Sequence, residues 1–212
     1  MNFKLTAVAI AALLAGGGLA LTLRAPGLAV APGTAVTGPA APAAVTGKAL
    51  IGGPFSLVDT TGKRVTDADF RGRYMLVYFG YTFCPDVCPA SLQVICAALD
   101  QLGPDGEKVT PVFITLDPAR DTPEKLGAYV KSFHPRLVGL TGSAEEIASV
   151  VKAYRVYAKK APDEKNPADY TMDHSSIVFL MGPNGGLVAF SPETSKVDAL
   201  VAQLRKGLAV KG

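Results

Sequence analysis

The sequence predicts an α/β fold in which a mixed β-sheet is flanked by helices. Segments typical of strands and of helices alternate from about residue 50 onward, and the chain closes with a hairpin pattern and an amphipathic helix. Two runs, 74–81 and 109–116, are almost entirely apolar, as in strands that are buried on both faces. This order of elements predicts a sheet with helices on both sides.

The first half of this region contains a hairpin and a helix beside the two apolar runs. Residues 55–65, FSLVDTTGKRV, alternate around Thr61-Gly62, which is typical of a β-hairpin. A helix is predicted from Pro89 to Leu102, because Gly103-Pro104 then ends it. Its apolar residues recur at intervals of three and four positions: Leu92, Ile95, Cys96, Leu99 and Leu102.

The second half carries two helix starts that can be read from their capping residues. Thr122 is expected to cap a helix whose first position is Pro123. Ser143 and Glu146 are spaced as a capping box for a helix that reaches Tyr154. The remaining predicted elements are a short strand at 137–142, two strands joined by an Asn-Gly turn at 175–190, and a helix from Thr194 to Lys206.

Composition and charge narrow the class of protein. The chain has 212 residues, of which 49% are hydrophobic, so it can bury a substantial core. Its net charge of +3 comes from acids and bases that are mixed along the chain, and no nucleic-acid partner is expected. Three cysteines are too few for a disulfide scaffold, and a close pair with one left over indicates redox or metal chemistry.

The N-terminal region predicts an exported, membrane-anchored protein. The uncharged stretch inside residues 1–24, from Leu5 to Leu23, would span roughly 28 Å as a helix, close to the about 30 Å of a bilayer core. A cleaved signal peptide is the alternative, although its apolar part is usually about 7–15 residues long. Residues 25–49, rich in Pro, Ala and Gly, are interpreted as a flexible tether, and residues 50–212 as the folded domain.

The cysteine pair, Cys84 and Cys88, lies where the first buried strand gives way to the first helix. The carboxyl end of a strand is a usual place for a site, and the positive end of a helix dipole stabilises a thiolate. A spacer of three residues permits both a shared metal ion and a disulfide. Cys96 lies on the apolar stripe of the helix and is interpreted as a buried core residue.

A metal would require a third ligand, and the chain contains only two histidines. His134, in SFHPR, is interpreted as part of a helix end. His174, in MDHSSIVF, is expected in the loop that enters the last hairpin, beside the start of the cysteine-bearing helix. Two thiolates and one imidazole suit Cu(I), while zinc and blue-copper-like Cu(II) sites use similar atoms.

Three acidic residues flank these candidates. Asp173 is expected to orient His174 by accepting a hydrogen bond. Asp86, between the cysteines, either tunes the thiolates or favours the turn. Asp117, which follows the second buried strand, is interpreted mainly as a turn residue.

Three separated motifs, GYTFCPDVCP, TLDPARDTP and DHSSIVFLMGPNG, follow one N-terminal apolar segment in this order. Together with FSLVDTTGKRV they closely resemble the Sco/SenC family from about residue 50 to the C-terminus. The resemblance implies a thioredoxin-like fold, a membrane anchor and a domain exposed to the periplasm or an equivalent compartment. It also implies one copper ion, as Cu(I) or Cu(II), with Cys84, Cys88 and His174 at the positions of the family's ligands.

The same resemblance implies a function in assembling the copper A centre of cytochrome c oxidase. The implied partner is the copper A subunit, with another periplasmic copper carrier as a further candidate. The first hypothesis is a metallochaperone. The alternative is an enzyme, a thiol-disulfide reductase that keeps the cysteines of that subunit reduced, with Cys84 and Cys88 as its redox-active pair. His174 discriminates between the two, because a metal site needs it and disulfide exchange does not.

Overall fold

The computed structural model describes residues 50–162, 169–192 and 196–209. The predicted anchor (1–24) and tether (25–49) lie outside these residues, so the division of the chain into anchor, tether and domain stays a prediction. None of the described helices has the length and apolar character that crossing a bilayer requires.

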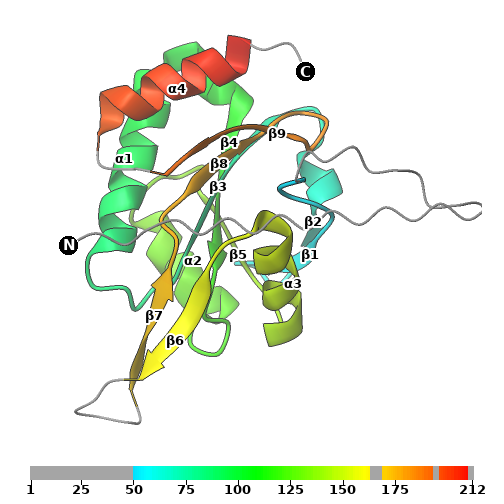
Figure 1. Cartoon of the computed structure of the whole chain (residues 1–212), viewed down its shortest axis with the longest axis vertical. Coiled ribbons are helices and arrows are strands. Elements are labelled where there is room, and N and C mark those ends of the chain that lie inside the picture. Colours follow the sequence, from blue (N-terminus) through cyan, green and yellow to red (C-terminus); the bar gives the residue numbers. More distant parts are fainter. Residues whose placement is uncertain (1–49, 163–168, 193–195, 210–212) are drawn as a thin grey trace, which may run out of the picture. The chain divides into compact units, whose positions relative to one another are not determined.

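A seven-stranded mixed sheet forms the centre of the described domain, in the order β2-β1-β5-β4-β3-β8-β9 (Figure 1). The central strands β3, β4 and β5 are parallel, whereas β1 and β8 run antiparallel to their neighbours β5 and β3. The predicted mixed sheet is therefore confirmed. The strands of this sheet are β1 (Ser56–Asp59), β2 (Arg64–Thr66), β3 (Tyr74–Gly80), β4 (Val109–Thr115), β5 (Val138–Thr141), β8 (Val178–Met181) and β9 (Leu187–Ser191).

Helices cover both faces of the sheet, as predicted. On one face the ring of Tyr129, from α2, packs 5.6 Å from Phe113 of β4, which itself contacts Tyr78 of β3. The next residue of β3, Phe79, points to the opposite face and packs 5.2 Å from Tyr154 of α3. The helices are α1 (Val87–Gln101), α2 (Pro123–Lys131), α3 (Ala144–Tyr154) and α4 (Val197–Ala209), with short 3-10 helices at Asp67–Phe70 and Gly103–Lys108.

Local sequence signals account for the starts of α2 and α3. The hydroxyl of Thr122 accepts a hydrogen bond from the backbone N–H of Lys125, and Pro123 occupies the first turn. Ser143 and Glu146 form the predicted capping box. In each case a side chain satisfies backbone donors that the helix itself leaves free.

The start of α1 lies earlier than predicted. The helix begins at Val87 rather than Pro89, so Cys88 belongs to its first turn. Proline is tolerated there, because first-turn N–H groups have no partner within the helix. The predicted apolar stripe of α1 is confirmed, since all five of its members are buried: Leu92, Ile95, Cys96, Leu99 and Leu102.

Our prediction that His174 lies in the loop before the last hairpin was wrong, because that loop is limited to residues 175–177. Strands β6 (Ala158–Pro162) and β7 (Tyr170–His174) form a separate two-stranded antiparallel ribbon, which projects beside the sheet in Figure 1. The sequence did not indicate it, because β6 contains two lysines and a proline and β7 buries only Met172. His174 consequently occupies the last position of a strand instead of a loop.

Candidate metal centre

The cysteine loop, residues 81–86, joins the carboxyl end of β3 to the first turn of α1. Cys84 is partly exposed and precedes the helix, and its backbone N–H donates to the carbonyl oxygen of Tyr81 at 3.2 Å. Cys88 is fully buried, and its backbone N–H points at Cys84 Sγ at 3.3 Å. The helix start therefore directs a backbone donor at the more exposed sulfur.

His174 approaches this loop from the end of β7. Its Nε2 lies 3.3 Å from Cys88 Sγ, and its Nδ1 lies 3.2 Å from the carbonyl oxygen of Ser175. A proton on Nδ1 can be donated to that carbonyl, which leaves the Nε2 lone pair directed at the sulfur. The ring of Tyr81 packs edge-on against the imidazole, with 5.9 Å between ring centroids. The three candidate ligands of the sequence are thus brought together.

The two thiols have opposite electrostatic environments. A hydrogen bond from the Cys88 thiol lowers the pKa of Cys84 to about 3, against the effect of burial and with help from His174 and from backbone N–H groups. The same hydrogen bond, together with burial, raises the pKa of Cys88. Cys84 is therefore a thiolate in the metal-free protein and Cys88 holds the proton.

The donor set fits a soft metal ion. The two sulfurs and the imidazole nitrogen all lie within 4.8 Å of one another. Metal–sulfur and metal–nitrogen bonds of about 2.3 and 2.0 Å, as in zinc sites, hold ligand atoms up to about 4.6 Å apart. Small side-chain rotations would bring all three donors onto one ion. Thiolate and imidazole ligands select copper or zinc over magnesium or calcium.

A cavity of about 290 Å³ opens over Cys84 and His174, two of the three donors. Asp86 and Asp173 line it together with Cys84 and His174, and both carboxylate side chains belong to exposed residues. The backbone N–H of Asp86 contributes to the low pKa of Cys84. The assignment of Asp86 and Asp173 as groups that tune or orient the ligands stays a prediction.

The other cysteine and the other histidine lie outside this group. Cys96 is buried, and the loss of water around it, with a smaller contribution from Asp100, raises the pKa of its thiol to about 11. His134 Nε2 lies 3.3 Å from Asp100 Oδ1, and its Nδ1 accepts the backbone N–H of Arg136. Cys96 as a core residue is confirmed, and His134 is engaged at a helix end as predicted.

A buried carboxylate that sequence reasoning missed anchors the cysteine loop. Asp121 accepts hydrogen bonds from the backbone N–H and the hydroxyl of Thr82, at 3.0 and 2.5 Å, and from the hydroxyl of Thr115 at 2.6 Å. Thr82 lies two residues before Cys84, and Thr115 ends β4. Because Asp121 is 0% exposed, these bonds fix the loop to the carboxyl end of the neighbouring strand. The signal in the sequence that could have identified Asp121 was its position a few residues after the buried strand β4.

Asp117 forms the predicted turn and makes a further set of contacts. Its carbonyl oxygen accepts the backbone N–H groups of Arg120 and Asp121. Its carboxylate accepts hydrogen bonds from Arg120 Nε and from the hydroxyl of Tyr170. Sequence reasoning did not single out Arg120 or Tyr170.

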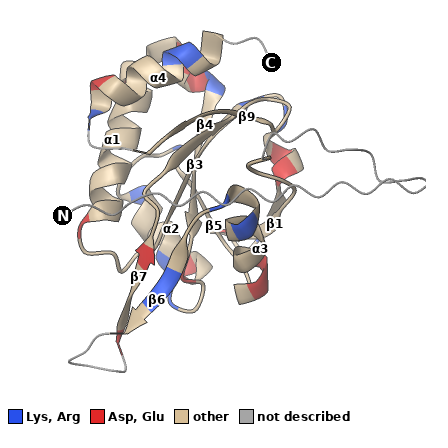
Figure 2. Ribbon diagram, in the orientation of Figure 1, with Lys and Arg blue, Asp and Glu red and all other residues tan. Residues whose placement is uncertain are grey.

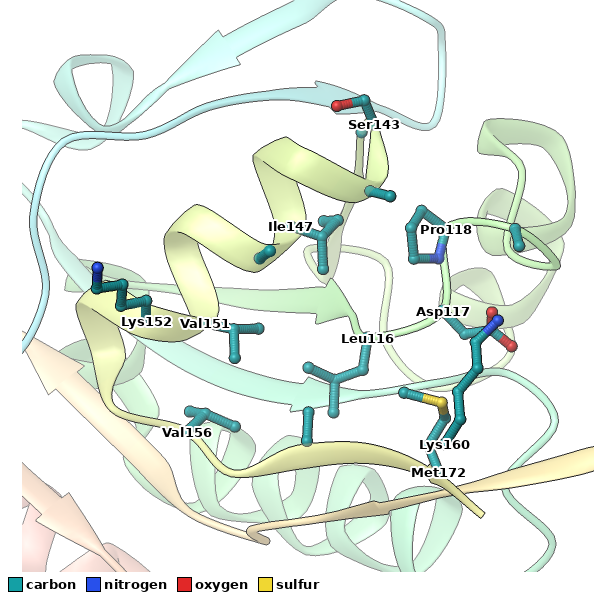
Figure 3. A pocket seen from close by; sticks show the side chains of 15 residues that line it. Leu116, Asp117, Pro118, Ser143, Ile147, Val151, Lys152, Val156, Lys160 and Met172 are labelled. Carbon is teal, nitrogen blue, oxygen red and sulfur yellow. The ribbon is translucent and has the colours of Figure 1, made fainter. Parts of the chain in front are cut away.

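An apolar groove of about 700 Å³ adjoins the site (Figure 3). Ile147 and Val151 of α3 form one side, and Met172, which also lines the cavity over the donors, forms part of the other. Its polar lining includes Asp117, Lys152 and Lys160 but no thiol or imidazole. Apart from the thioether of Met172, which lines both cavities, the groove therefore lacks the thiol and imidazole donors that the smaller cavity offers.

Comparison with known proteins identifies relatives over the whole described domain. The family model described as SCO1/SenC matches residues 43–209. The Arabidopsis thaliana protein named "Protein SCO1 homolog 1, mitochondrial" is 49% identical over 155 residues, which cover 73% of this chain and 46% of that protein. This chain spans about half the length of the curated relatives it matches.

Two solved structures that resemble this chain contain copper. Arabidopsis thaliana ScoI with copper bound has a TM-score of 0.70 and 46% identity, covering 74% of this chain and 98% of that one. Bradyrhizobium japonicum ScoI with copper bound has a TM-score of 0.66 and 46% identity over the same shares. The match to the family model spans the cysteine loop, the ribbon and the main sheet.

Proposed function

The chain belongs to the SCO1/SenC family, and from this premise we propose that it binds one copper ion through Cys84, Cys88 and His174 as a metallochaperone. The family resemblance seen in the sequence motifs is thereby confirmed, and with it the thioredoxin-like fold. The observation that carries the proposal is the convergence of two sulfurs and one imidazole nitrogen within 4.8 Å. Copper is the cargo of this site.

The metal-free protein is prepared to take up the ion. Cys84 is already ionised, and Nε2 of His174 lies 3.3 Å from the second sulfur. Binding requires only that the proton of Cys88 leave, so uptake is coupled to proton release. Two thiolates and a neutral imidazole favour Cu(I), and the same set can hold Cu(II).

The exposure of the site supports transfer to another protein. Cys84 is partly exposed, and the neighbouring side chains of Phe83 and Val87 are 54% and 48% exposed. Incoming thiolate or imidazole ligands can therefore reach the ion from the Cys84 side while Cys88 remains buried. Exposed apolar side chains around a site are typical of a contact surface for a protein partner. We take that partner to be the copper A subunit of cytochrome c oxidase, with another copper carrier as the donor.

We also propose that the domain is anchored to a membrane and exposed on its periplasmic or equivalent side. An uncharged N-terminal stretch long enough to span a bilayer supports a single-pass anchor, with the domain on the periplasmic or equivalent side. The Arabidopsis relative is named as mitochondrial. An anchor of this kind would keep the copper site close to a membrane-embedded oxidase.

The opposite protonation of the two thiols favours a second candidate, a thiol-disulfide reductase. The Cys84 thiolate would attack a disulfide of the copper A subunit and release one of its sulfurs as a thiolate. Cys88, after losing its proton, would attack Cys84 Sγ and release the second sulfur. The partner gains two electrons, and Cys84 and Cys88 become a disulfide that an external reductant must reopen.

Metal analysis of the purified protein tests the copper proposal. After anaerobic reduction and exposure to Cu(I), the protein should retain one copper per chain after desalting, because both thiolates are available. The same protein oxidised to the Cys84–Cys88 disulfide should retain none, since the two sulfurs are then bonded to each other and are no longer thiolates. Copper that stays on the oxidised form, or reduced protein that holds no copper, would overturn the proposed site.

A further inference from the structure

Apart from the chain segments that enter and leave it, the ribbon that carries His174 is held against the main domain by side-chain contacts, not by a strand ladder. β6 and β7 pair with each other, and the seven-stranded sheet contains neither of them. The position of His174 relative to the cysteines therefore depends on what holds this ribbon. We propose that Arg120, with Asp117 and Tyr170, is a positioning group that sets the distance between His174 and the cysteine loop; this inference rests on the proposed copper site.

Arg120 binds Tyr170, the first residue of β7. Its Nη1 donates to the carbonyl oxygen of Tyr170 at 3.0 Å, and its Cζ lies 3.7 Å from the centroid of the Tyr170 ring. The Tyr170 hydroxyl donates to Asp117 Oδ1 at 2.8 Å, while Asp117 Oδ2 accepts from Arg120 Nε. Tyr170 and His174 are the two ends of one five-residue strand, so fixing the first restricts the second.

The ribbon supplies a second cation to the same ring. Lys160 of β6 places its Nζ 4.3 Å from the centroid of Tyr170, and Figure 3 shows its side chain beside Asp117 and Met172. Lys160 lies in the basic part of β6 that is blue in Figure 2. The ring of Tyr170 is thus held by cations from two separate segments.

On its other side Arg120 contacts the cysteine loop. Its Cζ lies 4.7 Å from the ring centroid of Phe83, the residue before Cys84, and 5.8 Å from that of Tyr81. Tyr81 in turn packs against the imidazole of His174. One guanidinium therefore contacts both the segment that carries the sulfurs and the strand that carries the nitrogen.

The chemistry of the group explains why arginine occupies this position. Side-chain exposure is 17% for Arg120 and 1% for Asp117, so removing Arg120 would leave a buried carboxylate without this partner, and removing Asp117 would leave Arg120 with the exposed Asp169 at 3.5 Å. A planar guanidinium can stack on aromatic rings while it donates in its own plane, and a lysine ammonium cannot. Arg120 does not face copper as a ligand, because a guanidinium has no free lone pair at neutral pH.

Arg120→Lys tests the proposal in the full-length protein, with Arg136→Lys as the matched control. Arg136 is also partly buried and donates to the carbonyl oxygens of Gly106 and Val109, away from the cysteines. Tyr170→Phe provides a milder variant, since it deletes only the hydroxyl that binds Asp117. Each reduced variant is titrated with Cu(I) against a competing chelator.

We expect Arg120→Lys to raise the Kd for Cu(I) by about 10–100-fold, as for other changes behind a ligand, and Tyr170→Phe to raise it several-fold. Arg136→Lys should remain close to the wild-type value. In a His174→Ala background, Arg120→Lys should cause no further loss, because its effect passes through His174. Wild-type affinity in Arg120→Lys, or losses that multiply in the double variant, would overturn the proposal.

A metal-free measurement separates this inference from the copper function. In the reduced protein, NMR cross-relaxation between the rings of His174 and Tyr81 should be present in the wild type and in Arg136→Lys. It should weaken or disappear in Arg120→Lys and weaken in Tyr170→Phe. If the contact is present in the wild type and weakens in Arg120→Lys, but the wild-type protein binds no copper, the metal function alone is refuted. An unchanged contact in both test variants would refute the positioning role alone.

Discussion

Cys88 Sγ lies 3.3 Å from His174 Nε2, although 86 positions of the chain separate the two residues. Cys88 is placed by the first turn of α1 and His174 by the end of a ribbon that stands apart from the main sheet. A soft-metal site at this point therefore depends on two elements that fold from distant parts of the sequence. The predictions that follow test each side of this contact.

His174→Ala should separate the two candidate functions. Removing the imidazole deletes one of three donors, so the Kd for Cu(I) should rise by at least the about 10–100-fold typical of lesser changes around metal sites. The rate at which the dithiol reduces a model disulfide should change only a few-fold, since it depends on thiolate fraction, leaving group and access. Chelator competition and a stopped-flow reduction assay give the two values. Unchanged copper affinity would favour the reductase.

Gly80→Ala should disturb Cys88 directly. A Cβ at Gly80 would lie 2.9 Å from Cys88 Sγ and 2.8 Å from the Phe113 ring, too close for either to stay in place. We expect a loss of about 1–3 kcal/mol in unfolding free energy, as for other overpacked cores, together with weaker copper binding. Denaturant unfolding and copper titration measure both. Gly53→Ala is the control, because its Cβ would meet Ala153 at an ordinary 3.7 Å.

The thiolate of Cys84 should be evident in its reactivity. Because its pKa is lowered to about 3, Cys84 is deprotonated at every pH well above that value. Its rate of alkylation by iodoacetamide in the reduced, metal-free protein should therefore stay nearly constant between about pH 5 and about pH 8, where an ordinary thiol gains about tenfold per unit. Mass spectrometry follows the modified peptide. A rate that rises tenfold per pH unit would contradict the hydrogen-bonded thiolate. Cys96 serves as the internal comparison: it is buried and its pKa is raised to about 11, so it should remain unmodified in the folded protein.

Cys96→Ala should cost stability without affecting copper. Cys96 is 6% exposed on the apolar stripe of α1, so truncation leaves a small cavity worth about 1 kcal/mol of unfolding free energy. Thermal or denaturant unfolding measures this loss, and titration with Cu(I) should give the wild-type stoichiometry. A variant that no longer binds copper would place Cys96 in the site and contradict its assignment to the core.

Short-range signals in the sequence determined much of the fold. Apolar runs predicted the central strands β3 and β4, and capping residues predicted the starts of α2 and α3, because these elements depend on neighbours within a few positions. The same kind of reasoning placed Cys84 and Cys88 at a helix start. His174 was identified because the chain contains only two histidines and because the order of the elements placed it beside the start of that helix.

The tertiary structure decided how the third donor reaches the sulfurs. The sequences of β6 and β7 are too polar for either segment to be recognised as a strand. The two strands form because they pair with each other and because side chains from the turn after β4 bind them. Arg120 and Asp121 gained their roles in the same way: the partly buried Arg120 and the buried Asp121 both contact segments that lie elsewhere in the sequence. Periodicity in the sequence indicates which face of a helix or strand is apolar. It does not indicate what a charged side chain binds, because that pairing depends on tertiary distances that the local sequence does not determine.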